Sequence, residues 1–166
     1  MVIGTLPEKG EEIALIVDGN FLGMDILNAV IELAGEPCKA LHIATLSLNP
    51  ENARQIAKLI DSGKILSATM VISEKFAKQS AETFNQIRAE LDAVDVPVAV
   101  DRNHAKINLF DYGKKKYVMH GSLNLRRCMS FEQCVLAESE ELYSFFLSFM
   151  DDIRDGSIQA LPQKTV

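Results

Sequence analysis

Short apolar runs alternate with segments whose apolar residues recur at every third or fourth position through the first hundred residues. The short runs predict buried strands, and the periodic segments predict amphipathic helices. The predicted strands cover residues 12–17, 39–46, 65–72 and 96–100. A helix is expected after each of the first three strands, and the third of these is one long helix that Ser73 caps. This alternation is typical of an α/β fold.

The remaining third of the chain is richer in strands. Three more are expected, at residues 106–110, 116–120 and 131–137. The first two flank Asp111-Tyr112-Gly113, which predicts a hairpin. A last helix carries apolar residues on one side between 142 and 153, and the tail from about residue 156 has the character of a poorly ordered terminus. Since no linker or repeat interrupts the pattern, we expect one domain over residues 1–166, with a mixed β-sheet flanked by helices on both faces.

The composition is that of a globular protein in a reducing compartment. Hydrophobic residues make up 48% of the chain and charged residues 24%, and no apolar run approaches the ~18 residues of a membrane span. The amino terminus lacks the basic and apolar regions of a signal peptide. The cysteines, Cys38, Cys128 and Cys134, are odd in number and lack zinc-site spacing. We therefore expect a cytoplasmic protein with reduced thiols, no metal site and no stable membrane association.

The charge is unevenly distributed along the chain. The net charge of −6 by itself argues against a polyanionic partner. Residues 101–127, however, contain seven lysines and arginines against two aspartates, so this segment carries +5 and the rest −11. Three of these cations are the run Lys114, Lys115 and Lys116, which either solubilises a hairpin tip or contacts an anionic substrate. Arg126 and Arg127 are equally open to surface solvation or to contact with a nucleic-acid backbone.

A cluster of polar residues with phosphate-binding character lies in the same segment. His104 and Lys106 are two residues apart in a run compatible with a strand, so their side chains should point to one face, which Asn108 would continue. Ser122 and Asn124 are again two apart. An imidazole, an ammonium group and neutral donors together suit the charge that develops on phosphoryl oxygens during a displacement.

The order and spacing of these residues resemble the signature of the phospholipase D superfamily, which is His-x-Lys, four residues, Asp, a gap and Gly-Ser-x-Asn. The matching positions are His104, Lys106, Asp111, Gly121, Ser122 and Asn124. The gap of nine residues before Gly121 is longer than the commonest spacing in the family, and a longer hairpin can absorb the extra residues. The resemblance implies structural roles for Asp111 and Gly121, where a glycine would allow close approach of the backbone to an anion.

The resemblance also implies the catalytic roles. His104 would attack phosphorus and form a phosphohistidine, while a second histidine protonates the leaving oxygen. Lys106 and Asn124 would hold the non-bridging oxygens, and Ser122 would add a hydroxyl donor. Glu132 lies where the family usually has a carboxylate that orients the histidine. No metal or other cofactor is required by this scheme.

The chain contains the His-x-Lys motif only once, because His42 and His120 are not followed by lysine two residues later. The second histidine should therefore be His104 of a twin subunit, as in the small single-motif nucleases of the superfamily. The resulting expectation is a homodimeric, metal-independent endonuclease that cleaves DNA or RNA. His120 could reach the phosphate but is expected to be a hydrogen-bonded strand-end residue, and His42 a satisfied buried histidine.

Two alternatives stay open from the sequence. The first is a phospholipid hydrolase or transphosphatidylase, although the chain has no amphipathic segment of the kind that binds membranes. The second is a non-catalytic nucleic-acid-binding or regulatory protein with the same fold.

Overall fold

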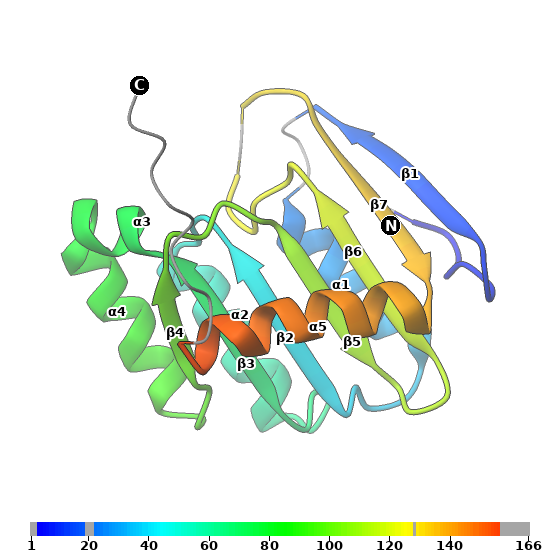
Figure 1. The fold of residues 1–166 in the computed structure, drawn as a ribbon. Helices are drawn as coiled ribbons and strands as arrows, with labels where there is room; N and C mark the ends of the chain where they lie inside the picture. The colour runs from blue at the N-terminus through cyan, green and yellow to red at the C-terminus, as the bar shows by residue number, and fades with distance from the viewer. Residues whose placement is uncertain (1–2, 19–21, 128, 157–166) are drawn as a thin grey trace.

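The computed structural model describes residues 3–18, 22–127 and 129–156, and its centre is a seven-stranded sheet (Figure 1). The strands are β1 (Glu12–Val17), β2 (Ala40–Thr45), β3 (Ala68–Ser73), β4 (Val98–Asp101), β5 (Ile107–Asp111), β6 (Lys116–Gly121) and β7 (Glu132–Glu138). The helices are α1 (Gly23–Ala34), α2 (Pro50–Asp61), α3 (Glu74–Gln79), α4 (Ala81–Asp92) and α5 (Glu140–Arg154). The strand order across the sheet is β1-β7-β6-β5-β2-β3-β4.

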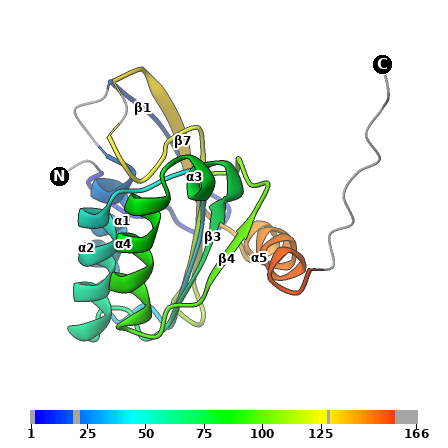
Figure 2. The same ribbon diagram turned by 90° about the vertical axis from the view of Figure 1, so that its left-hand side faces the viewer.

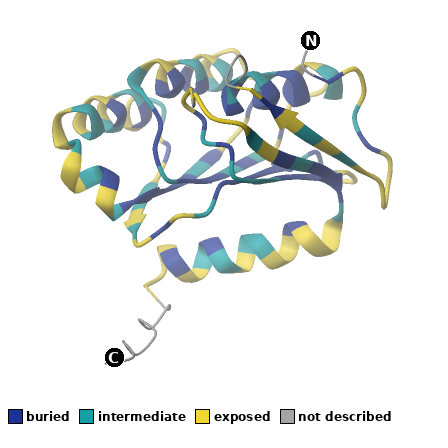
Figure 3. Cartoon of the chain, turned by 90° about the horizontal axis from the view of Figure 1, so that it is seen from above, coloured by how far each residue is buried: buried dark blue, intermediate teal, exposed yellow. Residues whose placement is uncertain are grey.

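Helices cover both faces of the sheet. The helices α1, α2 and α4 pack on one face, and of the helices in the described residues only α5 lies on the other (Figure 2). The larger core lies under the three helices and contains Leu27, Ile56 and Leu91. A smaller core lies under α5, where Tyr143 and Met150 are buried against the sheet. Figure 3 shows the buried strands between these two layers. The predicted mixed sheet with helices on both faces is confirmed.

The topology brings the motif residues to one end of the sheet. β2, β3 and β4 are parallel, whereas β5, β6, β7 and β1 continue the sheet as antiparallel neighbours. Ala44 at the end of β2 is therefore paired with Ile107 at the start of β5, and Ile107 is also paired with His120 near the end of β6. We call this the motif end of the sheet, where β2 and β6 end and β5 and β7 begin.

The single long helix predicted after Ser73 is wrong. Two helices, α3 and α4, are separated at Ser80, which has φ −129° and ψ 47°. The Ser80 amide donates to the Phe76 carbonyl at 2.9 Å, and the Ser80 carbonyl accepts from the Phe84 amide at 2.8 Å. Ser80 thus ends one helix and begins the next, as serine does more readily than the neighbouring helix formers. The Ser73 side chain makes no capping hydrogen bond.

Five of the seven predicted strands begin one to three residues later than expected. The strand expected from residue 65 begins at Ala68, and the one expected from Lys106 begins at Ile107. His104 and Lys106 consequently lie in the connection between β4 and β5, not in a strand. The tail expected from residue 156 lies outside the described residues beyond Gly156. No helix in the described part of the chain combines the length and the apolar character needed to cross a membrane.

Candidate active site at the motif end of the sheet

Three chain segments meet at the motif end. They are the connection from β4 to β5, the residues that follow β6 and the first residue of β7 (Figure 1). The Gly121 amide donates to the Lys106 carbonyl at 3.2 Å, which joins the first two segments. The Ser122 amide donates to the Gln133 carbonyl at 2.9 Å, which joins the second segment to β7. The backbone therefore gathers the motif residues although 28 positions separate His104 from Glu132.

His104 and Lys106 are in direct contact. Lys106 Nζ lies 3.0 Å from His104 Nδ1 and donates to the His104 carbonyl oxygen at 2.7 Å. The His104 side chain is exposed, whereas Lys106 is 8% exposed. Burial lowers the pKa of Lys106 below its usual value, and the charge of Glu132 opposes this shift. The site thus presents an accessible imidazole held against a largely buried amine.

Glu132 contacts a different partner from the one expected. The Ser122 hydroxyl donates to Glu132 Oε2, and the Gln133 amide donates to Ser122 Oγ at 3.1 Å. Within the described residues of this one chain, no hydrogen bond joins Glu132 to His104. Within one chain the expected pairing of Glu132 with the imidazole is therefore not made. Ser122 directly follows the adjacent strand β6, and its hydroxyl donates to the Glu132 carboxylate instead.

Asn124 is held between β2 and α1. Its Oδ1 accepts from Thr45 Oγ1 at 3.5 Å, and its carbonyl oxygen accepts from the Gly23 amide at 3.2 Å. A Cβ atom at Gly23 would lie 2.5 Å from that carbonyl oxygen, so only glycine allows the start of α1 to come this close. The amide of Asn124 is thereby fixed at the end of β2, in the same part of the sheet as Asn103 and the connection that carries His104.

Gly121 is required by the packing of the sheet. A Cβ atom at this position would lie 2.3 Å from the Gln133 carbonyl oxygen and 2.7 Å from Cys134 Cα. The missing side chain therefore makes room for the backbone of β7, and the close approach of the Gly121 backbone to an anion stays a prediction. This close packing of β6 against β7 sets the distance between Ser122 and Glu132.

Asn103 is a site residue that the sequence analysis missed. It is 4% exposed, and its Nδ2 donates to the carbonyl oxygens of Thr45 at 3.1 Å and Val71 at 3.4 Å. Its Oδ1 accepts from the Ala105 amide at 2.9 Å. One buried side chain thus ties the connection that carries His104 to the ends of β2 and β3. The only signal in the sequence was a polar residue directly before the motif.

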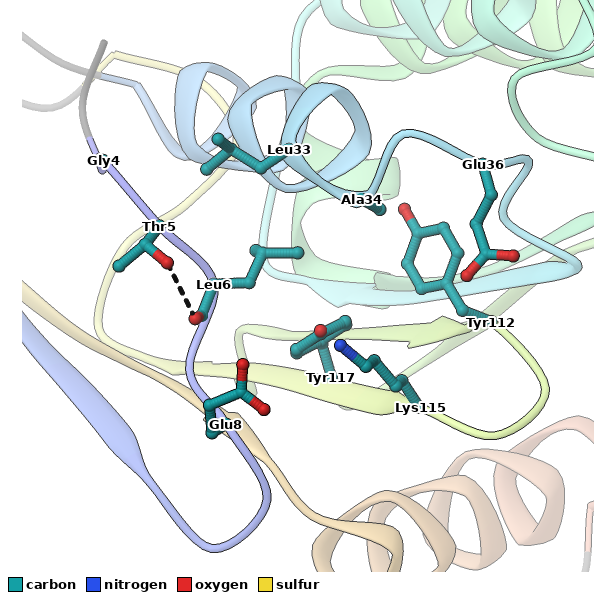
Figure 4. Close-up of a pocket in the computed structure, with 10 residues that line it drawn as sticks. All are labelled: Gly4, Thr5, Leu6, Glu8, Leu33, Ala34, Glu36, Tyr112, Lys115 and Tyr117. Carbon is teal, nitrogen blue, oxygen red and sulfur yellow. Dashed lines mark hydrogen bonds between the residues drawn. The ribbon is translucent and has the colours of Figure 1, made fainter.

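Asp111 and the run of lysines lie at the opposite end of the sheet. The Asp111 carboxylate accepts from the Gly113 amide at 2.6 Å and pairs with Lys116 at 2.5 Å. Asp111 lies four positions after Ile107 along β5, which at 3.3 Å per residue is roughly 13 Å. Lys115 lines a separate pocket with Glu8 and Glu36 among its other walls (Figure 4). In one chain, therefore, Lys114, Lys115 and Lys116 are not brought to His104.

The other histidines have distinct surroundings. The ring of His120 lies 5.5 Å from that of Phe146, and His120 lines a hollow of about 250 Å³ together with Lys106 and Ser122. His42 lies on β2 with Nδ1 2.8 Å from Thr69 Oγ1, and burial lowers its pKa. His42 is thus a satisfied histidine under α5, whereas His120 borders the candidate site.

The two arginines after Asn124 are both exposed. Arg126 lines a second hollow together with His104, so it lies at the motif end as expected of a substrate contact. No group of three or more histidine, cysteine, aspartate and glutamate side chains suited to a metal ion occurs in the described part of the chain.

Comparison with known proteins identifies relatives in fold only. No protein-family model matches the chain, and no curated protein matches it. NucT from Helicobacter pylori has a TM-score of 0.62 and 17% identity, covering 87% of this chain and 97% of NucT. Phosphatidylserine synthase from Haemophilus influenzae Rd KW20 has a TM-score of 0.58 and 16% identity, covering 92% of this chain and 42% of the synthase. TrmBL2, an archaeal chromatin protein with a novel mode of DNA binding, has a TM-score of 0.56 and 14% identity, covering 90% and 55%.

Proposed function

Since the chain has the phospholipase D-like fold shared by NucT and the synthase, as the motif predicted, we propose that it is a metal-independent nuclease. The observation that carries this proposal is the contact of His104 with Lys106 beside the Ser122–Glu132 pair. NucT, a phospholipase D-like nuclease, supports the choice of substrate because this chain covers nearly all of it. The larger synthase exceeds this chain more than twofold in length.

The proposed reaction has two displacements at phosphorus. His104 attacks, a phosphorus–nitrogen bond forms and the bond from phosphorus to the leaving oxygen breaks, while a second histidine gives that oxygen a proton. Water then attacks the phosphohistidine, gives up its proton to the second histidine and releases His104. Lys106 and Asn124 donate to the non-bridging oxygens, where fixed donors stabilise the developing charge, and Ser122 joins them when its hydroxyl hydrogen turns from Glu132 to the substrate.

The form of the imidazole decides which nitrogen can attack. When Lys106 donates to Nδ1, a neutral His104 ring carries its proton on Nε2 and cannot attack through that atom. A carboxylate that accepts from Nδ1 would move the proton there and free Nε2. Because Glu132 does not contact His104 in one chain, we propose that the ring acquires this partner when the complete site assembles.

We propose that the complete site is a homodimer in which the twin subunit supplies the second histidine. An apolar patch consisting of Ile16, Met129 and Phe131 borders the start of β7, and these side chains are 79–81% exposed. Ile16 is paired with Gln133, so the patch follows the β1–β7 ribbon directly beside Glu132. Exposed apolar clusters of this kind mark interaction surfaces. A twofold axis near the patch would bring two copies of His104 together.

The proposal is tested by cleavage in EDTA. Purified protein is incubated with single-stranded DNA, duplex DNA, RNA and phosphatidyl lipids, and His104→Ala serves as the inactive control. We expect nucleic-acid cleavage that survives EDTA, falls at least about 1,000-fold in His104→Ala and falls about 100-fold in Lys106→Ala. Turnover of lipids alone would replace the nuclease with a phospholipid enzyme, and binding of DNA without any turnover would favour a regulatory protein.

The dimer is tested at the apolar patch. Phe131→Glu should convert a dimer to a monomer by light scattering and remove cleavage, because it places two charges in one interface. Phe145→Glu is the matched control, since Phe145 is 67% exposed on α5. A wild-type protein that is active as a strict monomer would contradict the proposed assembly.

A further inference from the structure

A hollow beside His104 carries one further inference. It has a volume of about 200 Å³ and lies between the loop after β2, the helix α3 with Ser80, and the two motif segments. His104 and Arg126 form one wall. The lining residues contributed by the remaining elements are Leu46, Ser47, Lys75, Phe76, Gln79 and Ser80. If His104 attacks a phosphodiester, one of the two groups that are esterified to its phosphorus would therefore lie at this hollow.

Two cations that border the hollow form no ion pair within the described part of the chain. Neither Lys75 nor Arg126 forms an ion pair with any residue that the structure describes, whereas Lys78, on the same helix as Lys75, pairs with Glu74. An acidic chain that leaves two cations unpaired beside its nucleophile favours an anionic ligand there. The same two charges disfavour a cationic lipid headgroup such as choline or ethanolamine.

The walls between the cations suit a flat ring with polar edges. Leu46 and Phe76 supply apolar surface, and Gln79 supplies both an amide donor and an amide acceptor. The Ser47 side chain is 1% exposed, and its hydroxyl has no hydrogen-bond partner among the described residues. A buried unpaired hydroxyl is costly, and a ligand atom that paired with it would recover that cost. The hollow is smaller than the 300–1,000 Å³ of sites for drug-sized ligands, so it fits one ring system.

We propose that this hollow binds the nucleobase next to the scissile phosphate, with Lys75 and Arg126 on the flanking phosphate. This inference rests on the proposed nuclease function and narrows its substrate. A base inside the hollow is not available for pairing, so single strands or unpaired nucleotides are the preferred substrate, and duplex binds only after a base leaves the stack.

Binding to an inactive protein tests the inference separately from catalysis. All variants are made in the His104→Ala background, and binding of a fluorescein-labelled single-stranded oligonucleotide is measured by anisotropy at several salt concentrations. Lys75→Ala should weaken binding about five- to tenfold and lower the slope of log K against log salt by about 0.7. Lys78→Ala is the matched control and should change neither, because Lys78 lies on the same helix, is paired with Glu74 and does not line the hollow.

Ser47→Ala distinguishes a ligand contact from a structural role. It should weaken binding of the oligonucleotide about threefold without lowering stability to urea, because the hydroxyl has no protein partner to lose. An oligonucleotide with abasic positions should bind more weakly and should no longer distinguish Ser47→Ala from its parent, whereas Lys75→Ala should still weaken its binding because the phosphates remain.

Three results would overturn the inference. The first is equal binding of the oligonucleotide by Lys75→Ala and Lys78→Ala, and the second is equal affinity of the protein for duplex and single-stranded DNA. The third is that Lys75→Ala and Ser47→Ala weaken binding of the protein to phosphatidylcholine vesicles but not to the oligonucleotide. If the protein with His104 intact cleaves no nucleic acid yet the variants behave as expected, the nuclease proposal fails while the base-binding hollow stands.

Discussion

Asn103 offers the sharpest test of how the fold positions His104. Replacement by alanine removes two hydrogen bonds to the Thr45 and Val71 carbonyls and one from the Ala105 amide, all buried or half-buried. Each such bond is worth about 1 kcal/mol, and a buried group left unpaired adds to the loss. The carbonyl contact at 3.4 Å is long and contributes least. Asn103→Ala should therefore lower the free energy of unfolding by about 2–4 kcal/mol.

Activity should fall further than stability accounts for. Without the bond from the Ala105 amide, the connection that carries His104 is no longer fixed to β2 and β3, and a misplaced nucleophile costs about 100-fold in rate. Urea unfolding gives the stability, and kcat on single-stranded DNA is measured where the variant is fully folded. Asn85→Ala, at an exposed position of α4, is the control and should match the wild type in both.

Asn103→Asp separates shape from hydrogen bonding. The protonated acid can accept from Ala105 and donate to a carbonyl, whereas the carboxylate faces two carbonyl oxygens. The pKa of this aspartate should therefore be raised in the folded state, so the stability of the variant relative to the wild type should be highest below about pH 4 and should fall as the pH rises through the folded pKa. The reasoning would be refuted if Asn103→Ala were within about 0.5 kcal/mol of Asn85→Ala, or if the stability of Asn103→Asp relative to the wild type rose with pH above about 4.

Three further outcomes are expected. Gly121→Ala should lower the free energy of unfolding by about 3 kcal/mol or more in urea melts, since its Cβ would lie 2.3 Å from a carbonyl oxygen, while Gly4→Ala, with no atom within 4 Å, should have little effect. His120→Ala should retain most of the wild-type cleavage rate, whereas His104→Ala should lose it. An equal loss of rate in the two variants in kinetic assays would identify His120 as a proton donor within the chain. Burial lowers the pKa of His42 in the folded state, so the protein should lose stability as the pH falls below about 6.5, and His42→Asn should flatten this dependence in urea melts at several pH values.

The periodicity of the sequence was sufficient to predict the sheet and its flanking helices, because each element buries a continuous apolar face. The start of α2 also has a local signal, since Pro50 is its first residue and the Asn49 side chain accepts from the Asn52 amide at 2.8 Å. The break at Ser80 was not predictable in the same way. The apolar residues on either side of it continue at helical spacing, and only the packing of α3 against β3 and β4 and of α4 against α2 shows that the chain turns there.

The motif predicted which residues meet but not how. His104 and Lys106 are in contact as expected, yet through a loop shaped by Asn103, not through the alternation of a strand. The partner of Glu132 could not be predicted, since Ser122 reaches that carboxylate only because Gly121 lets β6 and β7 approach closely. Contacts between strand ends depend on register, which no local pattern encodes.

The positive segment of the sequence has a different meaning in three dimensions. Its five excess charges divide between two ends of the sheet, and the lysines of the hairpin lie with Asp111 about 13 Å or more from Ile107. The charge beside His104 is instead assembled from Lys106, Arg126 and a lysine of α3 that lies outside the segment. An anionic substrate is therefore supported by cations from separate elements that converge on the nucleophile. Of the cations in the segment, Lys106 and Arg126 reach the site, whereas Lys114, Lys115 and Lys116 do not do so in one chain.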